Sequence, residues 1–117
     1  MFILELYALP NGKKPVEEFI EQLNPKMQVK AIDSLEILQE RGNTLREPYS
    51  KPIKGCDGLF ELRIRFAGDI SRIFYFFFVG KKIVVTNGFV KKDQKTPKSE
   101  IALAIKYKLD YERRFLK

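Results

Sequence analysis

The stretch 59-LFELRIRFAGDISRIFYFFFVG-80 decides the fold, because its pattern predicts two strands joined by a tight turn. Apolar and charged side chains alternate over residues 60–66, so an extended chain would place the two kinds on opposite faces of a sheet. The second strand is almost continuously apolar, and Arg72 is its only formal charge between Asp69 and Lys81. One face of this hairpin is expected to be core, and the arginines on the other face need an explanation.

The rest of the chain supplies clear start and stop signals for further elements. Pro and Gly punctuate the N-terminal part, and an Asn-Pro pair and a Thr-Pro pair are typical of helix starts. The predicted elements are a strand over 2–8, a helix beginning at Pro15, a helix from Asn24-Pro25 to Gly42, strands over 60–66, 73–78 and 82–90, and a last helix with Thr96 as N-cap and Pro97 at its first position. A loop-like segment is predicted over 45–50. We therefore predict one α+β domain, residues 1–117, with an N-terminal strand, a helical hairpin, a three-stranded antiparallel meander and a C-terminal helix.

The composition is that of a folded protein with room for a core. The chain has 117 residues, 44% of them hydrophobic, and 15 aromatic residues, 10 Phe and 5 Tyr, which excludes a disordered class. No apolar run reaches the ~20 residues that a membrane span requires. The first residues contain no basic leader, so we read them as a strand and expect a cytoplasmic protein without a membrane partner. The single cysteine, Cys56, excludes an internal disulfide and is read as an incidental loop thiol.

The positive charge is concentrated in the C-terminal part of the chain. Residues 1–47 carry six Lys/Arg against eight Asp/Glu, whereas residues 48–117 carry sixteen against seven, which gives net charges of −2 and +9. A block of this kind favours phosphate-rich partners through Coulomb attraction and counterion release. Composition alone is equally compatible with lysines and arginines that only keep the protein in solution.

The absence of histidine removes most familiar catalytic sites. A Ser-His-Asp triad, a Cys-His pair, an HExxH zinc site and the histidine acid/base pair of many ribonucleases all need that residue. The chain also has no GxxxxGK phosphate loop and no GxGxxG motif. We therefore expect neither a metal site nor a bound cofactor.

A cluster of cations remains as the candidate site. Neighbouring strands lie ~4.8 Å apart, and every second residue shares a face, so the meander is expected to gather these side chains. Arginine forks bind phosphate oxygens at two points, and they can stabilise the extra charge of a pentacoordinate phosphorus. No metal is needed if the attacking group is the 2′-hydroxyl of RNA itself. The candidate catalytic residues are Glu61, Arg63, Arg65 and Arg72, and the candidate RNA-binding residues are Lys54, Lys91, Lys92 and Lys95.

A structural interpretation of the same residues stays open at this point. Glu61 can pair with an arginine across the strands, an interaction worth roughly 0.2–1 kcal/mol. Arg63 and Arg65 can be the solvated face of a half-buried sheet. Arg72 fits this interpretation least well, because it interrupts an apolar run.

The order and spacing of three short motifs resemble those of a known family. The blocks 59-LFELRIRFAGDISRIFYFF-77 and 87-NGFVKKDQKTPKSEI-101 are similar to the phage-derived Gp49-like group of HigB toxins, in the RelE/ParE superfamily of type II toxin–antitoxin systems. The resemblance covers residues 50–115 most strongly. It implies a RelE-like fold and metal-independent cleavage of mRNA in the ribosomal A site.

The resemblance also implies partners and roles. Arg63, Arg65 and Arg72 fall where the superfamily places cations around the scissile phosphate, and Lys91, Lys92 and Lys95 follow the last strand, where further active-site cations lie. The expected partners are the ribosome, mRNA and a HigA-like helix-turn-helix antitoxin in a hetero-oligomer. Several relatives use a histidine or a C-terminal tyrosine as acid or base. This chain has no histidine, and its late tyrosines, Tyr107 and Tyr111, fall inside the predicted last helix. The choice of general base is therefore left open between Glu61 and a lysine of lowered pKa.

Two other functions remain as alternatives on the same scaffold. The chain can be a basic interaction module that binds an acidic partner or nucleic acid without cutting it. It can also be a ParE-like inhibitor of DNA gyrase, although the ELRIR and KKxxK cations favour an RNA substrate.

Overall fold

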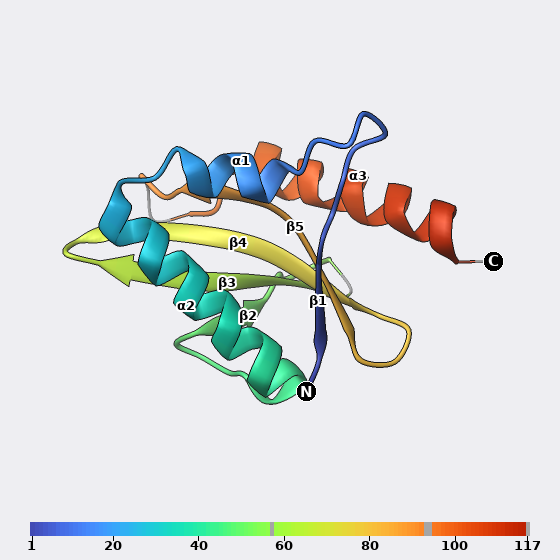
Figure 1. Ribbon diagram of the computed structural model, residues 1–117, viewed down its shortest axis with the longest axis horizontal. Helices are drawn as coiled ribbons and strands as arrows, with labels where there is room; N and C mark the ends of the chain where they lie inside the picture. Colours follow the sequence, from blue (N-terminus) through green and yellow to red (C-terminus); the bar gives the residue numbers. More distant parts are fainter. Residues whose placement is uncertain (57, 93–94, 117) are drawn as a thin grey trace.

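A five-stranded mixed sheet forms the centre of the protein in a computed structural model, which describes residues 1–56, 58–92 and 95–116 (Figure 1). The strands lie in the order β1-β5-β4-β3-β2. Their bounds are Ile3–Leu6 for β1, Ser50–Pro52 for β2, Leu59–Phe66 for β3, Asp69–Phe78 for β4 and Lys82–Val90 for β5. The helices are α1 (Pro15–Glu21), α2 (Pro25–Arg41), the 3-10 turn η1 (Gly42–Thr44) and α3 (Lys98–Phe115).

The sheet is antiparallel except at one edge. β3, β4 and β5 form the predicted meander, and β2 adds to β3 in antiparallel fashion. β1 instead pairs in parallel with β5, from Ile3 opposite Lys82 to Leu6 opposite Val85. A parallel neighbour requires a long crossover, which α1, α2 and the first strands of the meander provide. The α+β architecture is that expected of a RelE-like fold.

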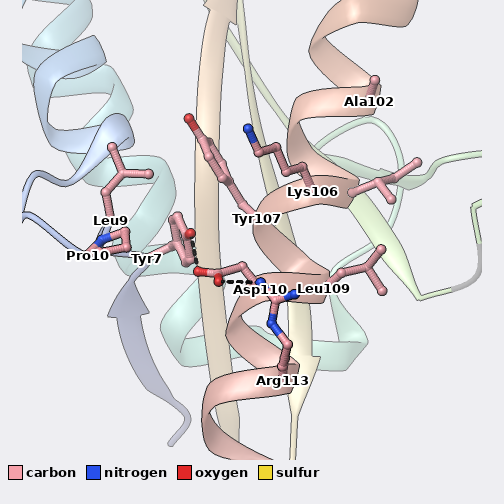
Figure 2. A pocket seen from close by; sticks show the side chains of 10 residues that line it. Tyr7, Leu9, Pro10, Ala102, Lys106, Tyr107, Leu109, Asp110 and Arg113 are labelled. Carbon is pink, nitrogen blue, oxygen red and sulfur yellow. Dashed lines mark hydrogen bonds and ion pairs between the residues drawn. The ribbon is translucent and has the colours of Figure 1, made fainter.

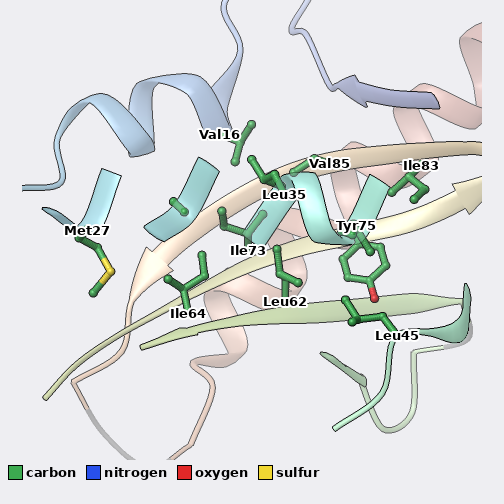
Figure 3. Packing of buried hydrophobic residues seen from close by; sticks show 12 residues of the cluster. Val16, Met27, Leu35, Leu45, Leu62, Ile64, Ile73, Tyr75, Ile83 and Val85 are labelled. Atoms are coloured by element: carbon green, nitrogen blue, oxygen red, sulfur yellow. The ribbon is translucent and has the colours of Figure 1, made fainter. Parts of the chain in front are cut away.

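The two faces of the sheet are covered by different helices. On one face α1 and α2 pack over a core that includes Val16, Leu38, Leu62 and Ile73, as Figure 3 shows for much of this cluster. On the other face α3, with Ala104 buried at its centre, packs over a separate set of side chains, Phe74, Phe76, Val84 and Phe89. The face of the sheet that lies under α3 is therefore buried too, and it forms a second core.

Most of the predicted elements are present, with shifts of a few residues at their ends. The Asn24 side chain accepts a hydrogen bond from the Met27 N–H at 2.9 Å, which confirms it as the N-cap of α2. α3 begins one residue later than predicted, because Pro97 occupies the N-cap position and Thr96 makes no capping bond. The loop predicted over 45–50 was wrong at its last residue, since Ser50 begins the edge strand β2, which continues to Pro52 and was not predicted.

Gly42 ends α2 with a positive φ of 55° and lies against the ring of Phe2. A Cβ at this position would lie 1.9 Å from a Phe2 ring carbon, so alanine requires both a left-handed backbone and a shift of the ring. Gly12 is a matched control, since its φ is +90° but a Cβ there meets nothing within 4 Å. We expect Gly42→Ala to lower the free energy of unfolding by about 1–3 kcal/mol more than Gly12→Ala, measured by urea denaturation. An equal loss of unfolding free energy in the two variants would show that the Phe2 ring moves aside without cost.

In the ranges that the structure describes, no helix has both the length and the apolar character needed to cross a membrane.

Candidate functional site

The register of the hairpin brings two arginines directly opposite each other. In the antiparallel pair of β3 and β4, Arg63 faces Arg72, and Arg65 faces Ile70. Directly opposed residues on one face have Cβ atoms roughly 4.5–5.5 Å apart, and like charges at that distance destabilise a sheet. The opposed arginines therefore form a place where an anion would be stabilising.

Arg72 is buried, and its only ionic partner among the described residues is Glu61. Arg72 is 2% exposed and Glu61 is 5% exposed, and the Arg72 Nε lies 2.7 Å from the Glu61 Oε2. This confirms the cross-strand pair that the structural interpretation allowed. It corrects the expectation that Glu61 lies on an outward face, since the residue sits between Leu59 and Arg63 on the face that α3 partly covers. Burial lowers the pKa of the Arg72 guanidinium, and the Glu61 carboxylate opposes that shift.

Lys91 joins the arginines from the end of β5. Its backbone N–H donates to the Ile70 carbonyl at 2.8 Å, which continues the β4–β5 ladder by one residue beyond the strand. Since Ser71 pairs with Val90 and Arg72 with Phe89, Lys91 falls opposite Ile70 and on the same face as Arg72. The β4–β5 register is irregular between Ile73 and Tyr75, close to this end of the strands. Bulges of this kind often re-aim side chains next to functional sites.

The arginines and Lys91 line an open hollow of about 600 Å³, here called the cation pocket. Of the residues that the structure describes, five cations and no acidic side chain line it, and the Glu61 carboxylate lies beneath them, paired with Arg72. Within the described residues, the buried Nε of Arg63 finds no hydrogen-bond acceptor. The lining residues are Arg63, Arg65, Gly68, Ile70, Arg72, Lys91 and Lys92.

The electrostatics of the cation pocket single out Lys91. Partial burial lowers the pKa of its ammonium from the ordinary value, and the positive charges of Arg72, Arg63 and Arg65 lower it further. The Glu61 carboxylate acts in the opposite direction, but it does not restore the ordinary value. Lys91 therefore loses its proton more readily than a solvated lysine, as a proton acceptor must.

Two predicted RNA-binding residues lie outside the cation pocket. Lys54 is exposed in the turn that precedes β3, roughly 13 Å along the strand from Arg63 by the usual rise per residue. Lys95 is exposed in the segment before α3 and does not line the pocket. A contact of either residue with RNA stays a prediction.

Another hollow, of about 690 Å³, lies between α3 and the chain after β1 (Figure 2). Three of its polar side chains are engaged with one another, since the Tyr7 hydroxyl donates to Asp110 at 2.5 Å and Arg113 pairs with the same carboxylate at 3.1 Å. Burial and the Asp110 carboxylate raise the pKa of Tyr7 to about 12. With Leu9, Pro10 and Leu109 as much of its wall, this hollow offers fewer free charges to a phosphate than the cation pocket does.

The two tyrosines of α3 are also accounted for by packing. Tyr111 is 1% exposed and donates to Glu5 at 3.0 Å, and the Tyr107 ring stacks on Tyr7 with centroids 4.6 Å apart. Neither lines the cation pocket. Among the described residues, no group of three or more Cys, Asp or Glu side chains is placed to hold a metal ion.

Comparison with known proteins identifies one family. The model of a family described as phage-derived, Gp49-like proteins matches residues 18–108, which is more than half of the chain and includes the whole cation pocket. A search of curated proteins found no match.

Proposed function

Because the chain belongs to the Gp49-like family of phage-derived proteins, a RelE/HigB-like toxin family, we propose that it is the toxin of a type II toxin–antitoxin system. Its proposed activity is ribosome-dependent, metal-independent cleavage of mRNA, which stops translation in the cytoplasm. A HigA-like helix-turn-helix antitoxin is the proposed partner that holds it inactive.

The observation that carries this proposal is the opposition of Arg63 and Arg72 across β3 and β4. A sheet does not gain stability from two guanidinium groups at this distance, and Arg72 is in addition taken out of water. A phosphodiester placed over the pair supplies the negative charge that the pocket lacks, through charge-assisted and bidentate hydrogen bonds. The cations are fixed in place before the substrate arrives, so they can stabilise the pentacoordinate phosphorus without reorganisation.

The proposed chemistry uses the RNA's own 2′-hydroxyl as nucleophile. Lys91, in its neutral form, accepts the proton of that hydroxyl while the oxygen attacks the adjacent phosphorus. The bond from phosphorus to the 5′-oxygen breaks, the 5′-oxygen takes up a proton from solvent, and a 2′,3′-cyclic phosphate remains. Arg63, Arg65 and Arg72 hold the phosphate oxygens, and Lys92 adds to the positive field.

Glu61 is assigned a positioning role instead of the proton transfer. Its carboxylate contacts Arg72 beneath the cation pocket and is 5% exposed, so it does not reach the lining. It fixes the orientation of the Arg72 guanidinium, whereas Lys91 lines the pocket itself.

Primer extension on a reporter mRNA in a reconstituted translation system tests the proposal. Arg65 is the informative position, because it is exposed and its loss leaves no buried charge, whereas Arg72→Ala would leave Glu61 unpaired. We expect discrete ribosome-dependent cuts with the wild type and a loss of about 100-fold in cutting rate with Arg65→Ala, since one charged contact to the phosphate is removed.

Lys13→Ala serves as the control, because Lys13 is exposed in the loop after β1 and does not line the cation pocket. Intact mRNA with the wild-type protein would overturn the nuclease proposal. Salt-sensitive RNA binding without cleavage would then favour a non-catalytic module, and DNA damage signalling on induction would favour a gyrase inhibitor.

A further inference from the structure

A second hollow adjoins the cation pocket across the edge of β3. It has a volume of about 470 Å³ and lies between α2, the chain that leads into β2, and the end of β3. Arg63 and Arg65 line both hollows, so the two are neighbours with the arginines between them. A group bound in one is within reach of a group bound in the other.

Tyr49 is held at the border of this second hollow. β2 pairs only with residues 60–62 of β3, and just beyond it the Tyr49 carbonyl accepts a hydrogen bond from the Arg63 N–H at 2.8 Å. The backbone of Tyr49 is thereby fixed beside Arg63, while the side chain is 59% exposed. Ile37 of α2 lines the same hollow and is 43% exposed.

The combination of an exposed aromatic ring, an aliphatic wall and two shared arginines is suited to a flat aromatic group attached to a phosphate. We propose that this hollow binds the nucleobase of a nucleotide next to the phosphate in the cation pocket, with the base stacked on Tyr49. Every base presents a π-face, so stacking on an aromatic side chain gives affinity without demanding one sequence. This inference rests on the proposed function, and it adds a base-binding site to the proposed phosphate site.

Polar groups of α2 give the base site a preference. Lys30, Asp33 and Ser34 of α2 line the hollow, and among the described residues the Asp33 carboxylate has no hydrogen-bond donor or ion-pair partner. Adenine, guanine and cytosine carry an exocyclic amino group that can donate to it, whereas uracil does not. The base site is therefore expected to favour a base with an exocyclic amino group, and Asp33→Ala, which removes the acceptor, is expected to abolish this preference.

Fluorescence titration with a short RNA tests the site without requiring cleavage. The probe is a 2′-O-methyl pentanucleotide of uridines with one central 2-aminopurine, whose emission falls when it stacks on an aromatic ring. We expect the wild type and Tyr49→Phe to quench the probe and to bind it equally. Tyr49→Ala should abolish the quenching and weaken binding about 10- to 100-fold, because stacking on the ring is lost.

The outcomes separate this site from the proposed function. If Arg65→Ala weakens binding while Tyr49→Ala leaves quenching and affinity unchanged, the base site is overturned and the cation pocket stands. If the wild type does not bind the probe, the base site is likewise overturned, and primer extension still judges the nuclease separately. A thermal melt accompanies each titration. Because Tyr49 is exposed, its variants are expected to melt at the wild-type temperature.

Discussion

Replacing Glu61 by alanine is expected to lower the free energy of unfolding by about 3–5 kcal/mol, because it leaves a buried guanidinium without its partner. Arg72 is 2% exposed and its Nε lies 2.7 Å from the Glu61 carboxylate. Arg72 lines the cation pocket but is almost wholly removed from water, so without the carboxylate most of the desolvation of its charge is left uncompensated. Urea denaturation followed by circular dichroism measures the change.

Replacing both partners separates the loss of the ion pair from the loss of side-chain packing. Glu61→Leu/Arg72→Met replaces both partners by apolar groups of similar size and is expected to recover most of the loss seen with Glu61→Ala. Glu17→Ala is the matched control, because Glu17 is an exposed carboxylate on α1 and should change stability little. A Glu61→Ala protein that loses less than about 1 kcal/mol would show that Arg72 finds water or another acceptor.

The largest effect on activity is expected at Lys91. Lys91→Met removes the proposed proton acceptor while keeping an unbranched side chain, and cleavage should fall by about 100- to 10,000-fold, the usual contribution of a general base. Cleavage rates from primer extension time courses give this factor. Lys92→Met is the control, because the neighbouring ammonium is exposed and adds only to the positive field of the cation pocket.

The pH dependence gives Lys91 a signature that a merely structural residue lacks. Burial and three neighbouring guanidinium groups lower the pKa of Lys91, so its neutral fraction near neutral pH exceeds that of a solvated lysine. Only the neutral amine accepts a proton, and the cleavage rate should therefore rise with pH until it levels off above the lowered pKa. Lys91→Met should remove this rise, and Lys92→Met should keep it. A rise that persists in Lys91→Met would assign the proton transfer to another group.

The local signals in the sequence were sufficient for most elements but not for the neighbours within the hairpin. Alternation over residues 60–66 and the apolar run after the turn predict both strands. The turn was expected at Gly68-Asp69, which would oppose Arg65 to Arg72, whereas the observed turn lies one residue earlier and opposes Arg63 to Arg72. The caps of α2 follow from Asn24 and Gly42. β2 was missed because three residues that include a proline have the composition of a loop and become a strand only through pairing with β3.

Features that depend on distant parts of the chain were not predictable in this way. The parallel pairing of β1 with β5 joins segments about 80 residues apart, and no local pattern encodes it. Glu61 and Arg65 occupy equivalent positions in the alternating pattern and share one face of β3. Glu61 is nevertheless buried and Arg65 exposed, because α3 covers only part of that face. Lys54 was grouped with the other cations by charge, and the fold places it near the opposite end of β3.

The contacts between β1 and α3 determine when the chain can complete its fold during synthesis. Tyr7 meets Asp110, Glu5 meets Tyr111 and the Ala8 carbonyl meets Arg114, at separations of 103 to 106 residues. β1 has no strand to pair with until residues 82–85 of β5 have been made, and one face of the sheet has no cover until α3 follows. The nascent domain is therefore expected to stay incomplete, with apolar surface exposed, until both β5 and α3 have been made.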